Sequence, residues 1–134
     1  MGRTGSAFAA PACFVALALA LLPLQATADP GCARDTTAES NECLRAKIAL
    51  ADDDMGYSYQ LLIDALTSSK PEEVENLRAA QRAWIGFRDA DCHFAGWIAR
   101  QGTMVSQLIN VCVLERTEQR KAELDNTWRS VLGL

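Results

Sequence analysis

The residue pair with the clearest chemical potential is Cys92–His93, a thiol beside the only histidine of the chain. A cysteine nucleophile needs a base within hydrogen-bond reach of its sulfur. Neighbouring residues on a helix point about 100° apart, so these two side chains would face different directions there. We therefore expect no catalytic residue in this pair, and the chain is predicted not to be an enzyme.

Three consecutive aspartates, Asp52 to Asp54, form a second candidate site, because carboxylates are the ligands that calcium prefers. Consecutive residues on a helix splay around its axis and do not converge on one ion. We therefore expect no metal and no cofactor. The pattern instead predicts a solvated acidic patch with Asp52 turned inward.

The cysteines offer cross-linking chemistry. Four of the five lie outside the hydrophobic N-terminal stretch: Cys32, Cys43, Cys92 and Cys112. Four cysteines in a short exported chain indicate two disulfides, which can pair in three ways. Cys92 and Cys112 are each ten residues from Gly102, in a turn signal, so a helical hairpin would bring them opposite one another. This geometry favours Cys92–Cys112, with Cys32–Cys43 as the second bond.

A polar set occupies the region that begins at Gln81, where Gln81, Trp84 and Arg88 recur at steps of three and four. Such residues share one face of a helix. An arginine on a face that meets a neighbour is costly unless it pairs with a carboxylate, and Asp52 is the best candidate. The alternative is a solvated Arg88 with its stem on Trp84. The first interpretation predicts a structural network that fixes helix register, packed by Trp84 and made of Asp52, Tyr59, Gln81 and Arg88.

Three helices must position these residues. Apolar residues recur at steps of three and four from residue 44 to 66, which predicts a helix that begins at about Thr36, with its N-cap at Thr36 or Thr37, and stops near residues 67–71. Pro71 suits the opening turn of a second helix, over residues 71–99. A third helix begins near Thr103.

The second helix carries apolar residues on more than one face, a pattern typical of a helix between two neighbours. We therefore expect it to lie in the middle of the fold, with Trp84 in the core. Trp97 and Trp128 are more readily explained as core or crevice fillers than as partner anchors, because tryptophan is mostly buried. Strand-like alternation is absent. The predicted fold class is all-α, a disulfide-stapled, antiparallel three-helix domain.

Residues 1–28 have the pattern of a signal peptide cleaved after about Ala28. Arg3 precedes an uncharged run from residue 7 to 22, and Ala26-Thr27-Ala28 has the small-x-small form of a cleavage site. The run is shorter than the roughly 20 apolar residues of a membrane span. We therefore expect a single helical domain over residues 29–134, without stable membrane insertion, in the periplasm or secreted.

The charge of this mature chain bears on its partners. Without Arg3, the thirteen basic side chains become twelve, against seventeen acidic ones, which gives a formal charge of −5. A negative field disfavours nucleic acid and anionic membranes and attracts basic partners. We expect a basic protein partner.

Several spaced residues together resemble a known family. They are Asp52-x-x-Met55-Gly56-x-x-Tyr59, Gln81-Arg82-x-Trp84-x-x-x-Arg88-Asp89-x-x-Cys92, Gly102-Thr103, Cys112, Thr117, Arg120 and Leu124. This pattern is similar to the LprI-like lysozyme-inhibitor family of small exported bacterial proteins, and it extends from Cys32 to about Leu124. The chain departs from the pattern at Gly56, where the family usually has asparagine.

The resemblance implies a periplasmic or secreted binding protein that inhibits lysozyme by occluding its glycan cleft. It assigns no inhibitory contact residue, although the loops at residues 68–71 and 101–103 are the natural protrusions. The alternative is a structural or adaptor protein of the envelope that binds another partner and does not inhibit lysozyme.

Overall fold

The computed structural model describes residues 30–99 and 102–134, and over these residues the chain is an all-α, three-helix domain without strands. Two short 3-10 turns accompany the helices. In chain order the elements are η1 (Pro30–Cys32), α1 (Thr37–Ser69), η2 (Pro71–Glu73), α2 (Val74–Trp97) and α3 (Met104–Leu132). The predicted fold class is confirmed. The predicted signal peptide and its cleavage site lie outside the described residues.

The predicted start of the first helix is confirmed by its cap. The Thr36 hydroxyl accepts from the backbone N–H of Glu39 at 3.2 Å, and the Glu39 carboxylate accepts from the backbone N–H of Thr36 at 3.2 Å. This capping box satisfies two donors that a helix start leaves free. α1 then runs through Gly56 and ends at Ser69, directly before the Lys70–Pro71 step.

The second helix is shorter than predicted at both ends. Pro71 opens a 3-10 turn, and α2 begins only at Val74. α2 ends at Trp97, two residues before the predicted Ala99. α3 has Thr103 as its N-cap, close to the predicted start.

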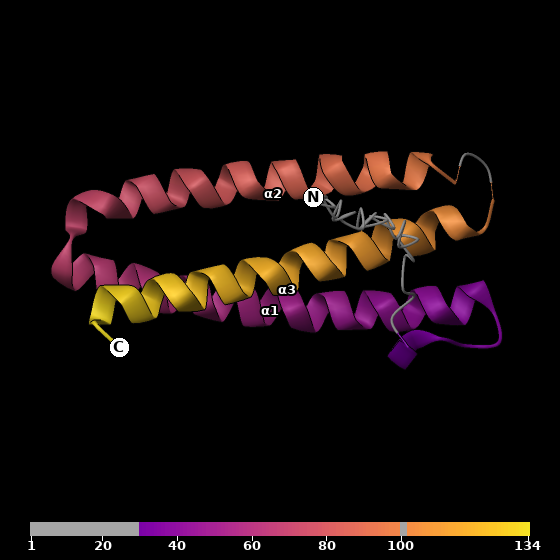
Figure 1. The fold of residues 1–134 in the computed structure, drawn as a ribbon, viewed down its shortest axis with the longest axis horizontal. Coiled ribbons are helices and arrows are strands. Elements are labelled where there is room, and N and C mark those ends of the chain that lie inside the picture. The colour runs from indigo at the N-terminus through magenta and orange to yellow at the C-terminus, as the bar shows by residue number, and fades with distance from the viewer. Residues whose placement is uncertain (1–29, 100–101) are drawn as a thin grey trace, which may run out of the picture.

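The prediction that the second helix lies in the middle is wrong, because α3 lies between α1 and α2 (Figure 1). α3 buries Leu114, Thr117 and Leu124, and its main packing partner is α1. The extra apolar residues of α2 do not meet a second helix: Phe87 and Phe94 remain more than half exposed. Apolar coverage of several faces of α2 therefore reflects an exposed apolar surface.

The core consists of two clusters along the α1–α3 interface. One joins Leu44 and Ala51 of α1 to Leu114 and to Cys32. The other gathers apolar residues nearer the opposite end of the bundle: Met55, Leu62, Leu66 and Leu124, with Tyr59, Trp84 and Trp128 packed against them. Full burial of one such leucine contributes about 1.5–3 kcal/mol. The apolar stripe predicted from the sequence is therefore the α1 side of the core.

Both predicted disulfides are present. Cys92 and Cys112 link α2 to α3 with a Cα–Cα distance of 5.4 Å, and Cys32 and Cys43 link η1 to α1 at 5.6 Å. The first bond cross-links the hairpin whose turn contains Gly102. The second holds Cys32, which is 2% exposed, against the core. No helix among the described residues is long and apolar enough to cross a membrane.

Candidate functional site

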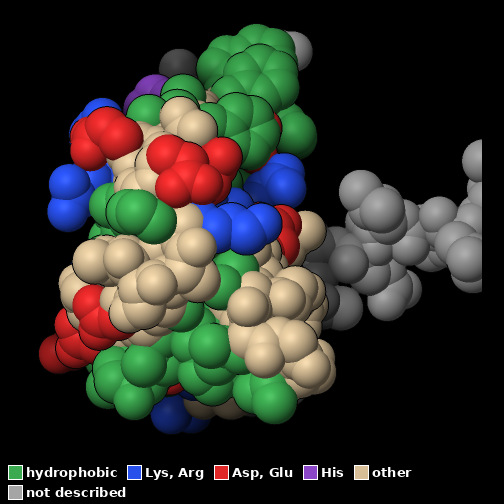
Figure 2. Space-filling model, turned by 90° about the vertical axis from the view of Figure 1, so that its left-hand side faces the viewer, with side chains coloured by type: hydrophobic (Ala, Val, Ile, Leu, Met, Phe, Trp, Pro, Cys, Tyr) green, Lys and Arg blue, Asp and Glu red, His purple; other side chains and the backbone are tan. Residues whose placement is uncertain are grey.

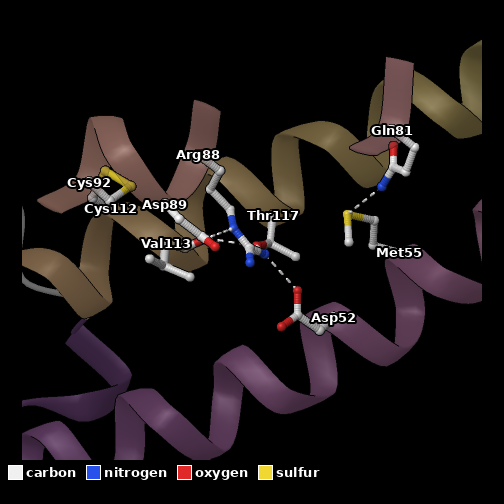
Figure 3. Close-up of polar contacts among 9 residues, drawn as sticks. All are labelled: Asp52, Met55, Gln81, Arg88, Asp89, Cys92, Cys112, Val113 and Thr117. Carbon is white, nitrogen blue, oxygen red and sulfur yellow. Dashed lines mark hydrogen bonds and ion pairs between the residues drawn. A yellow bond between two sulfur atoms is a disulfide. The ribbon is translucent and has the colours of Figure 1, made fainter. Parts of the chain in front are cut away.

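The structure brings Arg88 and Asp52 together as the sequence predicts (Figure 3). Arg88 Nη1 donates to Asp52 Oδ1 at 2.8 Å and to Thr117 Oγ1 at 3.0 Å. Its Nε donates to Asp89 Oδ1 at 2.9 Å. The arginine side chain is only 11% exposed, so it is a largely buried cation that joins all three helices.

Thr117 is the central acceptor of this contact and was not among the residues predicted for the network. It is completely buried, and its hydroxyl donates to the backbone carbonyl of Val113 at 2.8 Å while accepting from Arg88. Its signal in the sequence is its spacing, because Thr117 and Arg120 interrupt the apolar stripe of α3 that continues at Leu124. Polar residues on a buried stripe require partners from another helix.

Gln81 belongs to a second polar cluster, about two turns of α2 away from Arg88. Its Oε1 accepts from Arg120 Nε at 3.0 Å, and its Nε2 lies 3.6 Å from Met55 Sδ. The Trp84 ring separates the clusters, with the guanidinium carbons of Arg88 and Arg120 at 5.3 Å and 5.8 Å from its centroid. The indole is therefore contacted by two cations, an attractive arrangement for an electron-rich ring face.

Tyr59 is not part of either polar cluster. Among the described residues it packs against the apolar cluster of Leu62 and Leu124 and makes no hydrogen bond to Asp52 or Gln81. The structure therefore places the predicted polar residues in two clusters joined by Trp84, and Tyr59 contributes apolar packing.

Further polar contacts pin α1 to α3. Asn110 Nδ2 donates to Asn41 Oδ1 at 3.0 Å near one end of the pair. Toward the other end, the Ser58 hydroxyl of α1 hydrogen-bonds to the Asp125 carboxylate of α3, which also accepts from Lys121 Nζ of its own helix at 2.7 Å. This hydrogen bond from Lys121, helped by the Ser58 hydroxyl, lowers the pKa of the Asp125 carboxyl below its ordinary value.

The arrangement of these groups suits a structural role. Arg88 and Arg116 each pair with aspartates of the same chain, and Cys92 is held in a disulfide, so it offers no thiolate. His93 follows Cys92 directly in the sequence, but its side chain is exposed to solvent. Asp53 and Asp54 are exposed while Asp52 turns to Arg88, and the described residues hold no group of three side chains suited to a metal ion.

A different surface has the character of a binding site. Five large apolar side chains at the end of α2 and the start of α3 are 55–69% exposed, and we call them the aromatic end: Phe87, Phe94, Trp97, Ile98 and Met104. The rings of Phe94 and Trp97 stack at a centroid distance of 6.1 Å with 9° between their planes. The expectation that Trp97 fills the core is wrong, because α2 packs on its neighbours with the face that carries Cys92 and Gly96 and leaves Trp97 exposed. The same expectation for Trp128 is confirmed, because Trp128 packs on the core.

A groove adjoins the aromatic end between α2 and α3. It has a volume of about 580 Å³, and its apolar walls are Ala95 and Ile98 on one side and Leu108 and Val111 on the other. Glu115, Arg116 and Gln119 line its polar end. A groove of this size accommodates side chains of a partner.

Hydrophobic side chains reach the surface in several places. Figure 2, which looks along the bundle from the α1–α2 turn, shows them at the upper and lower edges of this view, with acidic and basic side chains between. On α1, Leu50 and Tyr57 are each 67% exposed, but they are separated by Asp53 and Asp54. The aromatic end is the place where such residues come close together with stacked rings.

These features define a class: a small, all-α scaffold cross-linked by two disulfides, with its polar residues used for packing and large apolar side chains exposed at one end. The chain belongs to the lysozyme inhibitor LprI family, whose model matches residues 30–124. The predicted resemblance is confirmed.

One bacterial relative is similar to most of the chain. The Rhizobium meliloti (strain 1021) protein named "Uncharacterized protein R02472" is 33% identical over 113 residues, which cover 76% of this chain and 81% of the relative. No solved structure matches the chain. The family membership thus rests on sequence, and the three-helix arrangement comes from the structure described above.

Proposed function

We propose that the protein is an exported binding protein that inhibits lysozyme by occluding its glycan-binding cleft. The observation that carries the proposal is the match to the lysozyme inhibitor family over residues 30–124, which includes all three helices up to Leu124. The structure supports a binding role with its disulfide-linked scaffold and its exposed aromatic end.

Export is part of this proposal. The two disulfides are stable in an oxidising compartment such as the periplasm or the extracellular medium. We expect the mature protein to begin at about Asp29, after removal of residues 1–28. Mass spectrometry of the protein purified from the periplasm or medium tests this, and a mass that still includes Arg3 would contradict it.

The physical basis of inhibition would be association of an acidic scaffold with a basic enzyme. The mature chain has a formal charge of −5, counted without Arg3. Such a charge raises the association rate with a cationic protein by long-range attraction, an effect that salt weakens. The rigid bundle then covers the cleft without itself doing chemistry.

A cell-wall lysis assay tests the proposal. Mature protein (residues 29–134) is mixed with lysozyme at physiological ionic strength, and the decrease in turbidity of a cell-wall suspension is followed. We expect lysis to fall in a saturable way as the inhibitor approaches and exceeds the enzyme concentration. An unrelated acidic protein of the same net charge is the control, because it reports non-specific charge effects.

Undiminished lysis at a large molar excess, together with no binding in calorimetry, would contradict the proposal. The alternative function is an envelope structural or adaptor protein, for which the aromatic end would contact another partner. Two results together would favour that alternative: this protein shows no affinity for lysozyme, and a pull-down with it from periplasmic extract recovers a specific envelope protein.

A further inference from the structure

The side chains of the aromatic end stay more than half exposed in the described part of the chain. Phe87, Phe94 and Ile98 follow one another at steps of seven and four along α2, so they share one face of the helix. The face of α2 that packs inward is a different one, with Gln81, Cys92 and Gly96 buried. The exposed residues therefore make little contribution to folding, and large apolar patches on a surface mark interaction sites.

This surface is held rigid. A Cβ added at Gly96 would lie 2.5 Å from Ile109 Cγ1, so the absence of a side chain there lets α3 approach α2 closely. The Cys92–Cys112 disulfide links the same two helices one turn away. A preorganised surface loses little conformational freedom when a partner binds.

The composition of this region matches that of protein interfaces. No lysine occurs between residues 71 and 120, whereas tryptophan, phenylalanine, methionine and arginine are all present at the aromatic end or beside it. Interfaces are enriched in these residues and depleted in lysine. Arg116 lies 5.9 Å from the Phe87 ring centroid and pairs with Asp91 at 2.8 Å, which extends the surface along the groove.

Charge distinguishes among the possible occupants. Arg116, which contacts Phe87, and Arg88 on the same helix as Phe87 are both paired with aspartates, so these two arginines offer little free positive charge to an anionic membrane. A second copy of the mature chain would carry the same charge of −5 and be repelled. A cationic protein is attracted, and Glu115 at the polar end of the groove can meet one of its basic side chains.

We infer that the aromatic end, with the adjoining groove, is the surface through which this protein contacts a cationic glycan hydrolase. Phe94 and Trp97 act as the stacked anchor, and the groove beside Ile98 receives an apolar side chain of the enzyme. This inference rests on the proposed function and adds to it the contact surface.

Two double variants matched in side-chain type and exposure test the inference. Trp97→Ser with Ile98→Ser removes an aromatic and an aliphatic residue of the aromatic end, which are 59% and 69% exposed. Tyr57→Ser with Leu50→Ser removes the same two types from α1, both 67% exposed. Each protein is titrated against lysozyme in the lysis assay and by calorimetry, and thermal unfolding checks that both variants fold.

We expect the aromatic-end variant to need at least about tenfold more protein for half-maximal inhibition, because anchor residues dominate binding. The α1 variant should change by less than about twofold, as expected for residues outside an interface. Glu115→Lys, which leaves the apolar residues in place, should also weaken inhibition, and this variant keeps the test decisive if the double variant unfolds.

Each other outcome has a distinct meaning. If the wild-type protein inhibits and the aromatic-end variant and Glu115→Lys inhibit equally well, the surface is wrong while the proposed function stands. If the wild-type protein neither inhibits nor binds lysozyme, the proposed function fails and the inference with it. A wild-type dimer in sedimentation that dissociates in the aromatic-end variant would assign this surface to a second copy and overturn the inference.

Discussion

Replacement of Arg88 by methionine is the sharpest test of how the three helices are held together. Methionine keeps an unbranched apolar stem that can lie on Trp84, but it removes the hydrogen bonds to Asp52, Thr117 and Asp89. The change therefore isolates the polar contribution of the side chain from most of its packing.

The expected cost follows from what each partner loses. Asp89 is 59% exposed and Asp52 is 41% exposed, so water can replace much of their contact with Arg88. Thr117 is completely buried and loses an accepted hydrogen bond, although it still donates to Val113. Hydrogen bonds to charged groups contribute about 1.5–3 kcal/mol and neutral ones about 1 kcal/mol, so with solvent exposure we expect a loss of about 2–3 kcal/mol.

The assay is a double-mutant cycle in urea unfolding, with Arg88→Met, Asp52→Asn and the double variant. We expect a coupling free energy of about 1–2 kcal/mol, between the values of exposed and fully buried ion pairs. The matched control is the pair Arg78–Glu75, whose side chains are 50% and 70% exposed. Its coupling should stay below about 0.5 kcal/mol and should decrease with added salt more than that of the partly buried pair.

A coupling between Arg88 and Asp52 no larger than that of the control pair would refute this reasoning. It would mean that the contact drawn between α1 and α2 contributes nothing in solution beyond an ordinary surface pair. A loss well above 4 kcal/mol for Arg88→Met would also contradict it, because such values indicate a fully buried charge left without its partner.

Three further predictions concern the disulfide, the glycines and pH. Removing the Cys92–Cys112 bond with paired alanine replacements should lower stability by about 3 kcal/mol for its loop, and an unchanged thermal unfolding curve would contradict this. Gly86→Ala, with open space around it, should stabilise by about 0.5–1 kcal/mol, whereas Gly96→Ala should be about 1–3 kcal/mol less favourable than Gly86→Ala because it crowds α3; denaturant unfolding compares the two. Because its pKa is lowered in the fold, the Asp125 carboxyl stabilises the folded state at pH values above its ordinary pKa of 3.8. This stability is lost as the pH falls through the folded pKa. Asp125→Asn should therefore be less stable than wild type at pH 7, with a difference that shrinks in acid; a difference independent of pH would contradict the lysine contact.

Local patterns were sufficient to predict much of this fold. The α1 stripe follows from residues spaced at one helical turn, and its start follows from a threonine, Thr36 or Thr37, that can cap a helix. The structure selects Thr36 through its contacts with Glu39. The disulfide pairing follows from equal distances to Gly102. Each of these depends on geometry within a single helix or hairpin, which the sequence encodes directly.

The polar site could be predicted only in part. Arg88 and Asp52 were identified because a buried arginine needs a carboxylate on a facing helix. Thr117 was missed as their partner because the third helix was expected on the far side of the second. Tyr59 lies on the predicted stripe of α1. Which residues it contacts depends on how α1 is shifted along its axis relative to the neighbouring helices, and the sequence pattern does not give this shift.

The sequence by itself determined the three helices, the N-terminal cap of the first, both cross-links and the family. Only the tertiary structure decided that α3 lies between α1 and α2, and therefore that Phe94 and Trp97 are exposed instead of buried. The reason is that helical periodicity shows which apolar side chains share one face of a helix. It does not show which other helix packs on that face, or whether any does. The aromatic end is apolar surface that none of the three described helices buries, and for this reason we infer that its role depends on a partner.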